Sequence, residues 1–153
     1  MEQCYYIFIL CFYILSFFVR NKNNAMNEIA KENELSKAAL DVCFRIHKLY
    51  GPGLFESVYE EIICYELEKD GFFIERQKAI PLIHETIKME AGFRADVIVE
   101  QKLLLELKSV EALTNIHYKQ VQTYLKLTGL KLGLLINFNT LLLKDGIKRI
   151  INT

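Results

Sequence analysis

Two carboxylates and a lysine near the middle of the chain have the residue types and the spacing of a metal-dependent hydrolytic site. Asp96 lies in one predicted strand, and Glu106 and Lys108 lie in the next, after a predicted hairpin turn at residues 100–102. Because side chains alternate along a strand, Glu106 and Lys108 point to the same face of the sheet. The hairpin brings Asp96 close to Glu106. The sequence therefore predicts two carboxylates and one ammonium group on a single patch.

Carboxylate oxygens of this kind suit Mg²⁺, which binds through one or two carboxylates and keeps several of its waters. A Mg²⁺ ion held there can activate water and offset charge on a phosphodiester, and a nearby lysine can position the water or stabilise the pentavalent state. The alternative is a chance E-x-K pair on a solvated strand face, which is common. The apolar run at residues 103–105 favours chemistry, because a charged pair that directly follows such a strand costs more free energy than a pair in a loop.

Polar residues on two predicted helices extend this set. Glu56 falls in the first turn of a helix that follows a break at residues 51–53. An acidic side chain in the first turn interacts favourably with the helix dipole, and this interaction is by itself a sufficient explanation for Glu56. His117, Gln120 and Tyr124 are spaced i, i+3 and i+7 on a later helix, so they share one face. The alternative for these three is a polar stripe on a half-exposed helix. The spacing alone leaves both interpretations open.

Hydrophobic periodicity predicts the elements that must hold these side chains. Helices are expected at about Glu34–Tyr50, Phe55–Asp70 and Asn115–Leu127, and strand segments at Phe72–Ile83, Ile87–Met89, Phe93–Val99, Leu103–Ser109, Leu132–Phe138 and Ile147–Ile151. The inward face of the second helix is expected to comprise Val58, Ile62, Tyr65 and either Cys64 or Leu67. The nearly all-apolar segment 132–138 is typical of a strand buried on both faces. The order α-α-β-β-β-α-β-β predicts one α/β domain.

The charge of the chain is balanced overall but not along its length. Nineteen Lys and Arg are matched by nineteen Asp and Glu, which excludes a uniformly basic nucleic-acid-binding protein. Residues 26–101 carry nine basic and fifteen acidic side chains, whereas residues 102–153 carry eight basic and three acidic ones. Any basic surface must therefore come mainly from the C-terminal third.

The four cysteines, Cys4, Cys11, Cys43 and Cys64, include no C-x-x-C pair. Two lie in an apolar leader and two at helical positions of the body, which favours reduced thiols packed in a core over disulfides. A chain of 153 residues can also bury a sizeable core without disulfides or structural metal. A cytoplasmic location is therefore expected, and structural zinc is not.

Residues 4–19 form an almost continuous apolar run that does not match the rest of the chain. The run has 16 residues, fewer than the roughly 20 that an α-helix needs to span a bilayer. It makes a poor signal peptide, because Glu2 is acidic and no small-residue cleavage site precedes Arg20. Two interpretations remain: a true start at Met26 with residues 1–25 read through by mistake, or a short membrane anchor with the body in the cytoplasm. In either case residues 26–153 are expected to form the domain.

The order of the polar residues resembles the PD-(D/E)xK nuclease superfamily: a glutamate on an early helix, an aspartate in a strand, E-x-K in the next strand and Q-x-x-x-Y on the following helix. Residues 53–59 are similar to the signature of the GxxExxY proteins, a bacterial and archaeal family within that superfamily. The resemblance runs from about Asn33 to Asn152 and covers, in order, GPGLFESVYE, FRADVIVE, LLLELKSVE, IHYKQVQTYLKLTG, and GLLINF followed by LKDGIKRI. Five ordered blocks are far more specific than any one of them. Ala95 departs from the superfamily pattern, which has proline there.

The resemblance implies a restriction-endonuclease-like domain, with a mixed central sheet flanked by helices, that acts as a Mg²⁺- or Mn²⁺-dependent nuclease on DNA or RNA. The implied site comprises Asp96 and Glu106 as metal ligands, Lys108 as the catalytic lysine, Glu56 as an additional carboxylate near the metal, and Gln120 and Tyr124 beside the active site. The alternative is a non-catalytic relative that binds nucleic acid or a protein partner, in which Lys108 simply neutralises the two acids. A membrane partner is expected only if residues 4–19 are genuine, and the oligomeric state is left open.

Overall fold

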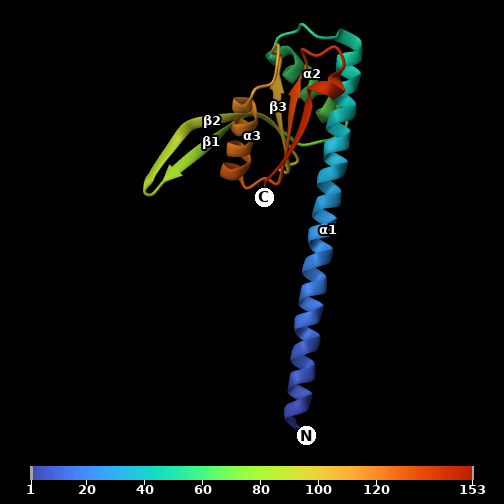
Figure 1. Cartoon of the computed structure of the whole chain (residues 1–153), viewed down its shortest axis with the longest axis vertical. Helices are drawn as coiled ribbons and strands as arrows, with labels where there is room; N and C mark the ends of the chain where they lie inside the picture. The colour runs from blue at the N-terminus through green and yellow to red at the C-terminus, as the bar shows by residue number, and fades with distance from the viewer. Residues whose placement is uncertain (1, 153) are drawn as a thin grey trace. The chain divides into compact units, whose positions relative to one another are not determined.

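The computed structural model of the chain describes residues 2–152, and it describes the side chains of residues 26–89 and 92–152. The chain divides into two compact units, Met1–Glu34 and Leu35–Thr153. The elements in chain order are α1 (Glu2–Tyr50), α2 (Glu56–Lys69), β1 (Ile74–His84), β2 (Ile87–Val99), β3 (Leu103–Lys108), α3 (Asn115–Thr128), β4 (Leu132–Asn137), the 3₁₀ helix η1 (Leu143–Gly146) and β5 (Ile147–Ile151) (Figure 1). The predicted order α-α-β-β-β-α-β-β is confirmed.

Helix α1 begins far earlier than the hydrophobic pattern indicates. The prediction places its start at about Glu34, whereas the helix begins at Glu2. Residues 26–31 are all exposed, so no buried stripe marks them as helical. They nevertheless include Met, Glu, Ala and Lys, which are strong helix formers, and they contain no Gly or Pro. Intrinsic propensity therefore explains why residues 26–31 are helical although the pattern gives no signal there.

Within residues 2–152, five strands form one mixed sheet in the order β1-β2-β3-β4-β5. β3 and β4 pair in parallel, and the other three pairs are antiparallel. The β2–β3 hairpin closes at Glu100 and Gln101, whose φ angles are 51° and 54°. Positive φ at both central positions is the geometry of a type I′ turn, which suits the twist of antiparallel strands. The predicted turn at residues 100–102 is therefore confirmed.

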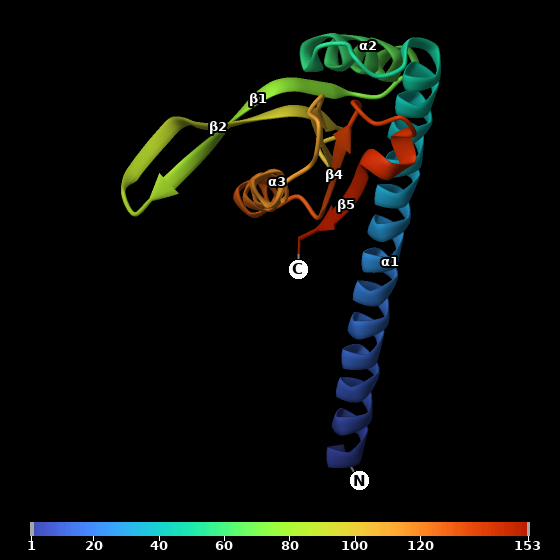
Figure 2. The ribbon, with the colours of Figure 1, turned by 45° about the horizontal axis from the view of Figure 1, so that its top comes forward.

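Helices cover both faces of this sheet, as Figure 2 shows. One core lies between the sheet and the helices α1 and α2, and it includes Ala39, Tyr59, Leu105 and Phe138. The other lies between the sheet and α3, and it includes Ile98, Leu104, Val121 and Leu135. Successive residues of β3 thus face opposite cores, as strand geometry requires. Burial on both faces explains why the first half of β3, and β4 up to Ile136, are so apolar.

The strand segments Ile87–Met89 and Phe93–Val99, which the sequence pattern separates, are continuous in β2. Its pairing with β1 passes from Ile80↔Phe93 directly to Leu82↔Met89. Residues 90–92 therefore lie opposite Pro81 alone, as a bulge in the ladder. Because proline has no N–H to donate, a bulge at this position avoids a missing ladder hydrogen bond. The strand continues through an interruption that resembles a turn in the sequence.

The predicted inward face of α2 is wrong in part. Val58 and Tyr65 are 37% and 62% exposed. The buried apolar residues are Tyr59, Ile63, Cys64 and Leu67. Glu60 is buried beside them, with 5% of its surface exposed. Because sequence reasoning assigns acidic residues to solvent, a buried glutamate on the inner face shifts the expected apolar stripe.

Cys43 and Cys64 are free, buried thiols, in agreement with the expected reduced state. Burial raises the pKa of each to about 12, so neither is a reactive thiolate near neutral pH. In residues 26–89 and 92–152, no helix has both the length and the apolar composition to cross a membrane. The apolar run 4–19 lies outside the described side chains, so both interpretations of it, and the domain boundary at residue 26, stay predictions.

Candidate active site

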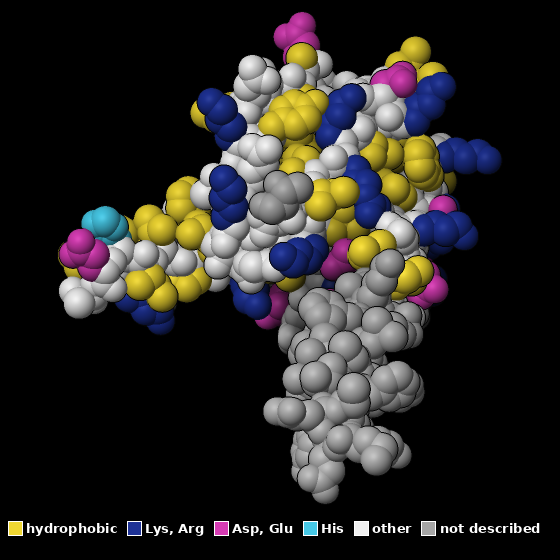
Figure 3. Space-filling model, turned by 60° about the horizontal axis from the view of Figure 1, so that its bottom comes forward, with side chains coloured by type: hydrophobic (Ala, Val, Ile, Leu, Met, Phe, Trp, Pro, Cys, Tyr) yellow, Lys and Arg dark blue, Asp and Glu magenta, His cyan; other side chains and the backbone are white. Residues whose placement is uncertain are grey.

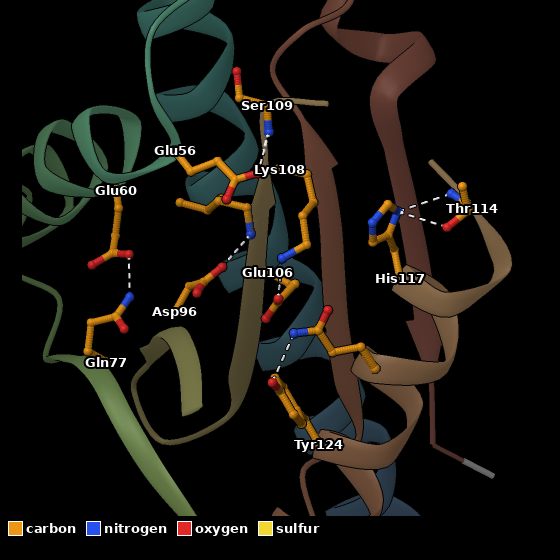
Figure 4. Close-up of polar contacts among 12 residues, drawn as sticks. Glu56, Glu60, Gln77, Asp96, Glu106, Lys108, Ser109, Thr114, His117 and Tyr124 are labelled. Atoms are coloured by element: carbon orange, nitrogen blue, oxygen red, sulfur yellow. Dashed lines mark hydrogen bonds and ion pairs between the residues drawn. The ribbon is translucent and has the colours of Figure 1, made fainter. Parts of the chain in front are cut away.

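The candidate site lies at the end of β3, just beyond its ladder with β2. That ladder ends at the pair Val97–Leu105. The same register carried one residue further places Asp96 opposite Glu106, and Lys108 follows on the same face of β3. Figure 4 shows these three side chains together. The structure therefore brings together the three strand residues that the sequence singles out.

Asp96 links the two strands where their ladder has ended. Its Oδ2 accepts a hydrogen bond from the backbone N–H of Leu107, with an N–O distance of 2.8 Å. Burial raises the pKa of Asp96, while this N–H and the ammonium of Lys108 act in the opposite direction. The main chain of β3 thereby holds the carboxylate in place next to Glu106.

Glu106 is the most deeply buried of the candidate residues, with 1% of its surface exposed. Its Oε1 accepts a hydrogen bond from Nζ of Lys108 at 2.5 Å. Its Oε2 is buried and has no hydrogen-bond partner among the described residues. Burial, and then the charge of Asp96, raise the pKa of Glu106 to about 7. A buried carboxylate oxygen without a partner is costly, so this atom is suited to a ligand that carries positive charge.

Lys108 is the cation within this cluster of acids. Its side chain is 13% exposed. Burial lowers the pKa of Lys108, but the attraction of Glu106, Asp96 and Glu56 outweighs burial, and the net change is upward. Lys108 is therefore protonated near neutral pH and offsets part of the acidic charge.

Helix α2 brings Glu56 to the same cluster. Glu56 is the first residue of α2, and its Oε1 accepts a hydrogen bond from the backbone N–H of Ser109 at 2.8 Å. The Oγ of Ser109 donates to the carbonyl of Leu54, also at 2.8 Å. The residue after β3 is therefore joined to the start of α2. The charge of Glu56 contributes to the raised pKa of both Asp96 and Glu106, so the three carboxylates act on one another.

Tyr59 fixes the loop from which α2 starts. Its hydroxyl donates to the carbonyl of Gly51 at 2.6 Å and accepts from the N–H of Leu54 at 3.3 Å. Its ring stacks on Phe138, with 4.2 Å between ring centroids. Because the loop residues are tied to a buried side chain on the first turn of α2, Glu56 leaves the helix in a defined direction.

Helix α3 supplies the remaining candidates. Gln120 donates from Nε2 to the hydroxyl of Tyr124 at 2.9 Å, as their spacing predicts. Tyr124 is 5% exposed and packs edge-on against Phe93. His117 is held by Thr114 at the start of the helix. Figure 4 shows Tyr124 and His117 on the side of α3 that faces Glu106 and Lys108.

Asn137 is a supporting residue that sequence analysis missed. Its Nδ2 donates to the carbonyl of Val110 at 2.8 Å, and its Oδ1 accepts from the N–H of Val110 at 3.1 Å. Lys108 and Asn137 form the last pair in the β3–β4 register. Its amide therefore continues the ladder and secures the chain immediately after Lys108 and Ser109. The signal in the sequence was a single polar residue in the apolar run LGLLINF.

Substitution of Gly146 tests this support. A Cβ added at Gly146 would overlap with the carbonyl oxygen of Asn137, a backbone atom that cannot rotate away. We expect Gly146→Ala to lower the free energy of unfolding by roughly 1–3 kcal/mol, because overpacking forces the backbone to shift. Urea denaturation measures the change, and Lys144→Ala, at an exposed position of the same 3₁₀ helix, is the control. Equal stability of the two variants would contradict the close approach.

Glu60 forms a second group that the sequence did not reveal. Its carboxylate accepts hydrogen bonds from Arg76 and, at 2.5 Å, from Nε2 of Gln77. Arg76 also pairs with Glu61. The charge of Glu60 contributes to the raised pKa of Asp96, so this group belongs to the electrostatic surroundings of the site. No local pattern could have found it, because its partners lie 16 and 17 residues away along the chain.

The donors at the site suit a hard divalent cation. Among the side chains that the structure describes, no three His, Cys, Asp or Glu are grouped as metal ligands. Asp96 and Glu106 offer two carboxylates, and Mg²⁺ binds through one or two carboxylates while water fills its other positions. The unpartnered Oε2 of Glu106 also fits a cation. The residues present are therefore compatible with Mg²⁺ or Mn²⁺.

Comparison with known proteins agrees with this geometry. Residues 33–150 match the model of the PD-(D/E)XK nuclease superfamily. No curated protein and no solved structure matches the chain. The matched range includes every candidate residue from Glu56 to Tyr124. Nucleic acid is the general substrate of this superfamily, and its members are typically metal-dependent. The chain therefore belongs to the PD-(D/E)XK nuclease superfamily.

Proposed function

We propose that the chain is a Mg²⁺- or Mn²⁺-dependent nuclease of the GxxExxY type that hydrolyses phosphodiester bonds in DNA or RNA. The observation that carries the proposal is the buried, unpartnered Oε2 of Glu106, next to Asp96 and Lys108. Such an atom lowers the stability of the protein. Metal-dependent hydrolysis is a function that uses it.

The proposed roles follow from what each side chain contacts. Asp96 and Glu106 would hold the ion, which when bound supplies a Lewis acid for the phosphate and an activated water. Lys108 is protonated, so it can donate a hydrogen bond to the attacking water or to a phosphate oxygen. Glu56 is oriented by Ser109 and adds a carboxylate at the rim. Gln120 and Tyr124, which are bonded to each other, would flank the substrate.

The three residues that define a GxxExxY signature each have a reason in this structure. Gly53 has a φ of 112°, a conformation that glycine adopts far more readily than other residues. Glu56 joins the start of α2 to Ser109. Tyr59 secures the loop between α1 and α2. The signature thus comprises the Glu56 carboxylate, a glycine in the preceding loop and a tyrosine that secures this loop, which supports the GxxExxY assignment.

Substrate would reach the site from open surface. A hollow of about 530 Å³ lies beside Glu56, and Phe55, Ser109 and Asn139 contribute to its lining. Figure 3 shows one face of the molecule, on which Lys and Arg side chains stand at separate points among hydrophobic and neutral surface. On this face, scattered cations favour local contact with a few phosphates over wrapping of a long duplex.

A second candidate function is a non-catalytic module that binds nucleic acid or a protein partner. One observation favours it: Lys108 already forms an ion pair with Glu106 at 2.5 Å, so the lysine neutralises a buried acid without any substrate. In this case the charged group is a structural remnant, and replacing it by apolar residues would not reduce binding.

Cleavage by the full chain separates the two functions. We expect the wild type to cleave at least one of single- and double-stranded DNA and RNA in Mg²⁺ or Mn²⁺, and EDTA to stop it. Lys108→Met removes the donor that stabilises transition-state charge, so we expect its rate to fall by about 100-fold or more. Lys148→Met, at an exposed position of β5, is the matched control and should keep the wild-type rate.

Two outcomes of this assay would count against the nuclease. Binding of the oligonucleotides with no cleavage in either metal would support the non-catalytic module. Cleavage by Lys108→Met at the wild-type rate would remove the lysine from catalysis.

A further inference from the structure

His117 of α3 is a polar side chain near the site that the proposed function does not use. It is half-buried, and its Nδ1 accepts a hydrogen bond from the backbone N–H of Thr114 at 3.0 Å. A backbone N–H can only donate, so Nδ1 carries no proton. The proton of the neutral ring is therefore on Nε2. Among the described residues, Nε2 has no hydrogen-bond partner.

In the view of Figure 4, this spare donor is directed toward the side of the site that holds Lys108. Figure 4 shows the ring nitrogen that is not bonded to Thr114 on the side of the ring toward Lys108. His117 shares its helix face with Gln120 and Tyr124, whose side chains are bonded to each other. No residue of α3 (NIHYKQVQTYLKLT) is acidic, so no carboxylate of this helix competes for the Nε2 proton.

Capping alone does not account for a histidine here. Thr114 and His117 form a capping box, in which the N3 side chain accepts the N–H of the N-cap residue. Glu and Gln are the usual residues at N3 and make the same bond. A histidine at this position makes the cap and also presents a second, differently directed nitrogen. That second nitrogen is the feature that needs a function.

We propose that His117 is a substrate-binding residue that donates a hydrogen bond from Nε2 to a phosphate oxygen of nucleic acid at the site. The inference rests on the proposed function, because it assigns a further contact to the same substrate. The cap holds the ring in one tautomer and one orientation before substrate arrives, so less side-chain freedom is lost on binding. Contacts to phosphate fix the register of the nucleic acid without reading its sequence.

Three substitutions separate the cap from the donor. His117→Glu keeps an acceptor for the Thr114 N–H and has no donor, His117→Gln keeps both an acceptor and a donor, and His117→Ala has neither. Ile116→Glu, at a position that is 71% exposed on the same turn, is the control for the added negative charge. The readouts are the dissociation constants for labelled single- and double-stranded oligonucleotides, with Ca²⁺ replacing Mg²⁺, and the thermal midpoint of each full-length variant.

The expected pattern differs between binding and stability. We expect His117→Ala and His117→Glu to weaken binding by about tenfold or more, the loss typical of a hydrogen bond to a charged group. His117→Gln and Ile116→Glu should stay within about threefold of the wild type. Thermal stability should follow the cap instead, so Glu and Gln should match the wild type and Ala should fall below it.

Two results would overturn the inference. Wild-type binding by His117→Glu would show that the cap is the whole role of the side chain, and it would leave the nuclease proposal standing. A wild type that neither binds nor cleaves any oligonucleotide would overturn the nuclease proposal and, with it, this contact.

Discussion

Replacing Asp96 by Asn is expected to abolish metal-dependent cleavage while the fold is retained. Asn keeps an oxygen that can accept the N–H of Leu107, so the link between β2 and β3 survives. What is lost is the negative charge that would bind the cation next to Glu106. The rate should fall by more than the roughly 10–100-fold that removal of a supporting group near a metal costs. Initial rates on the preferred oligonucleotide at saturating Mg²⁺ measure the loss.

Asp41→Asn is the matched control, because it removes the same charge from an exposed position of α1. It should cleave at the wild-type rate. Far-UV circular dichroism of both variants establishes that the fold is retained. An Asp96→Asn protein that keeps a tenth or more of the wild-type rate would show that this carboxylate does not bind a catalytic metal.

Glu106 is expected to make the metal-free protein less stable as the pH rises. Its pKa is raised from 4.5 to about 7 in the folded protein. Between these two pH values, the folded state therefore holds a proton that the unfolded state releases. The stability that this proton binding provides is present in full below about pH 4.5 and is lost as the pH rises through about 7. The loss is roughly 3 kcal/mol, because one pKa unit corresponds to about 1.4 kcal/mol. Glu106→Gln cannot titrate, so its stability should lack this component.

Urea denaturation in EDTA at pH 5 and pH 8 measures the effect as a difference between the two proteins. Comparing the two curves cancels the contribution of histidines and exposed acids that both share. We expect the free energy of unfolding of Glu106→Gln to rise relative to that of the wild type between pH 5 and pH 8. The variant should be inactive at both pH values. Parallel pH dependence of the two proteins would contradict the buried, perturbed carboxylate.

The strand residues of the site could be predicted because strand geometry is local. The alternation of side chains puts Glu106 and Lys108 on one face, and a two-residue turn then decides that Asp96 lies opposite. The order of the elements was equally accessible, since each helix and strand carries its own hydrophobic pattern. The roles of these residues in catalysis stay predictions.

Residues that depend on distant partners could not be predicted. Asn137 is buried with its amide on Val110, 27 residues away, yet its strand is otherwise typical of a plain hydrophobic core. Glu60 is buried because Arg76 and Gln77 reach it from β1. A buried ion pair can be recognised only once both partners are placed in the fold. Because the prediction did not include this pair, it assigned the wrong residues to the inner face of α2.

The predicted boundaries of α1 and β2 were wrong for a different reason. The first turns of α1 that the structure describes with side chains, residues 26–31, are exposed, so periodicity gives no signal there. The break expected within β2 failed because its partner strand carries Pro81, and a bulge lets the pairing resume on the other side. In both cases the sequence pattern reports burial, whereas the helix or strand itself continues through residues that lack the pattern.

The most direct test of the central claim is thermal unfolding of the full chain with and without Mg²⁺ or Mn²⁺, beside Asp96→Asn. A cation that binds only the folded state stabilises it by about 2.7 kcal/mol at a concentration 100 times its dissociation constant. For a chain of 153 residues this is a rise of several degrees in the midpoint. The account predicts such a rise in the wild type and none in Asp96→Asn. An equal rise in both proteins, or no rise in either, would contradict a metal site at Asp96 and Glu106.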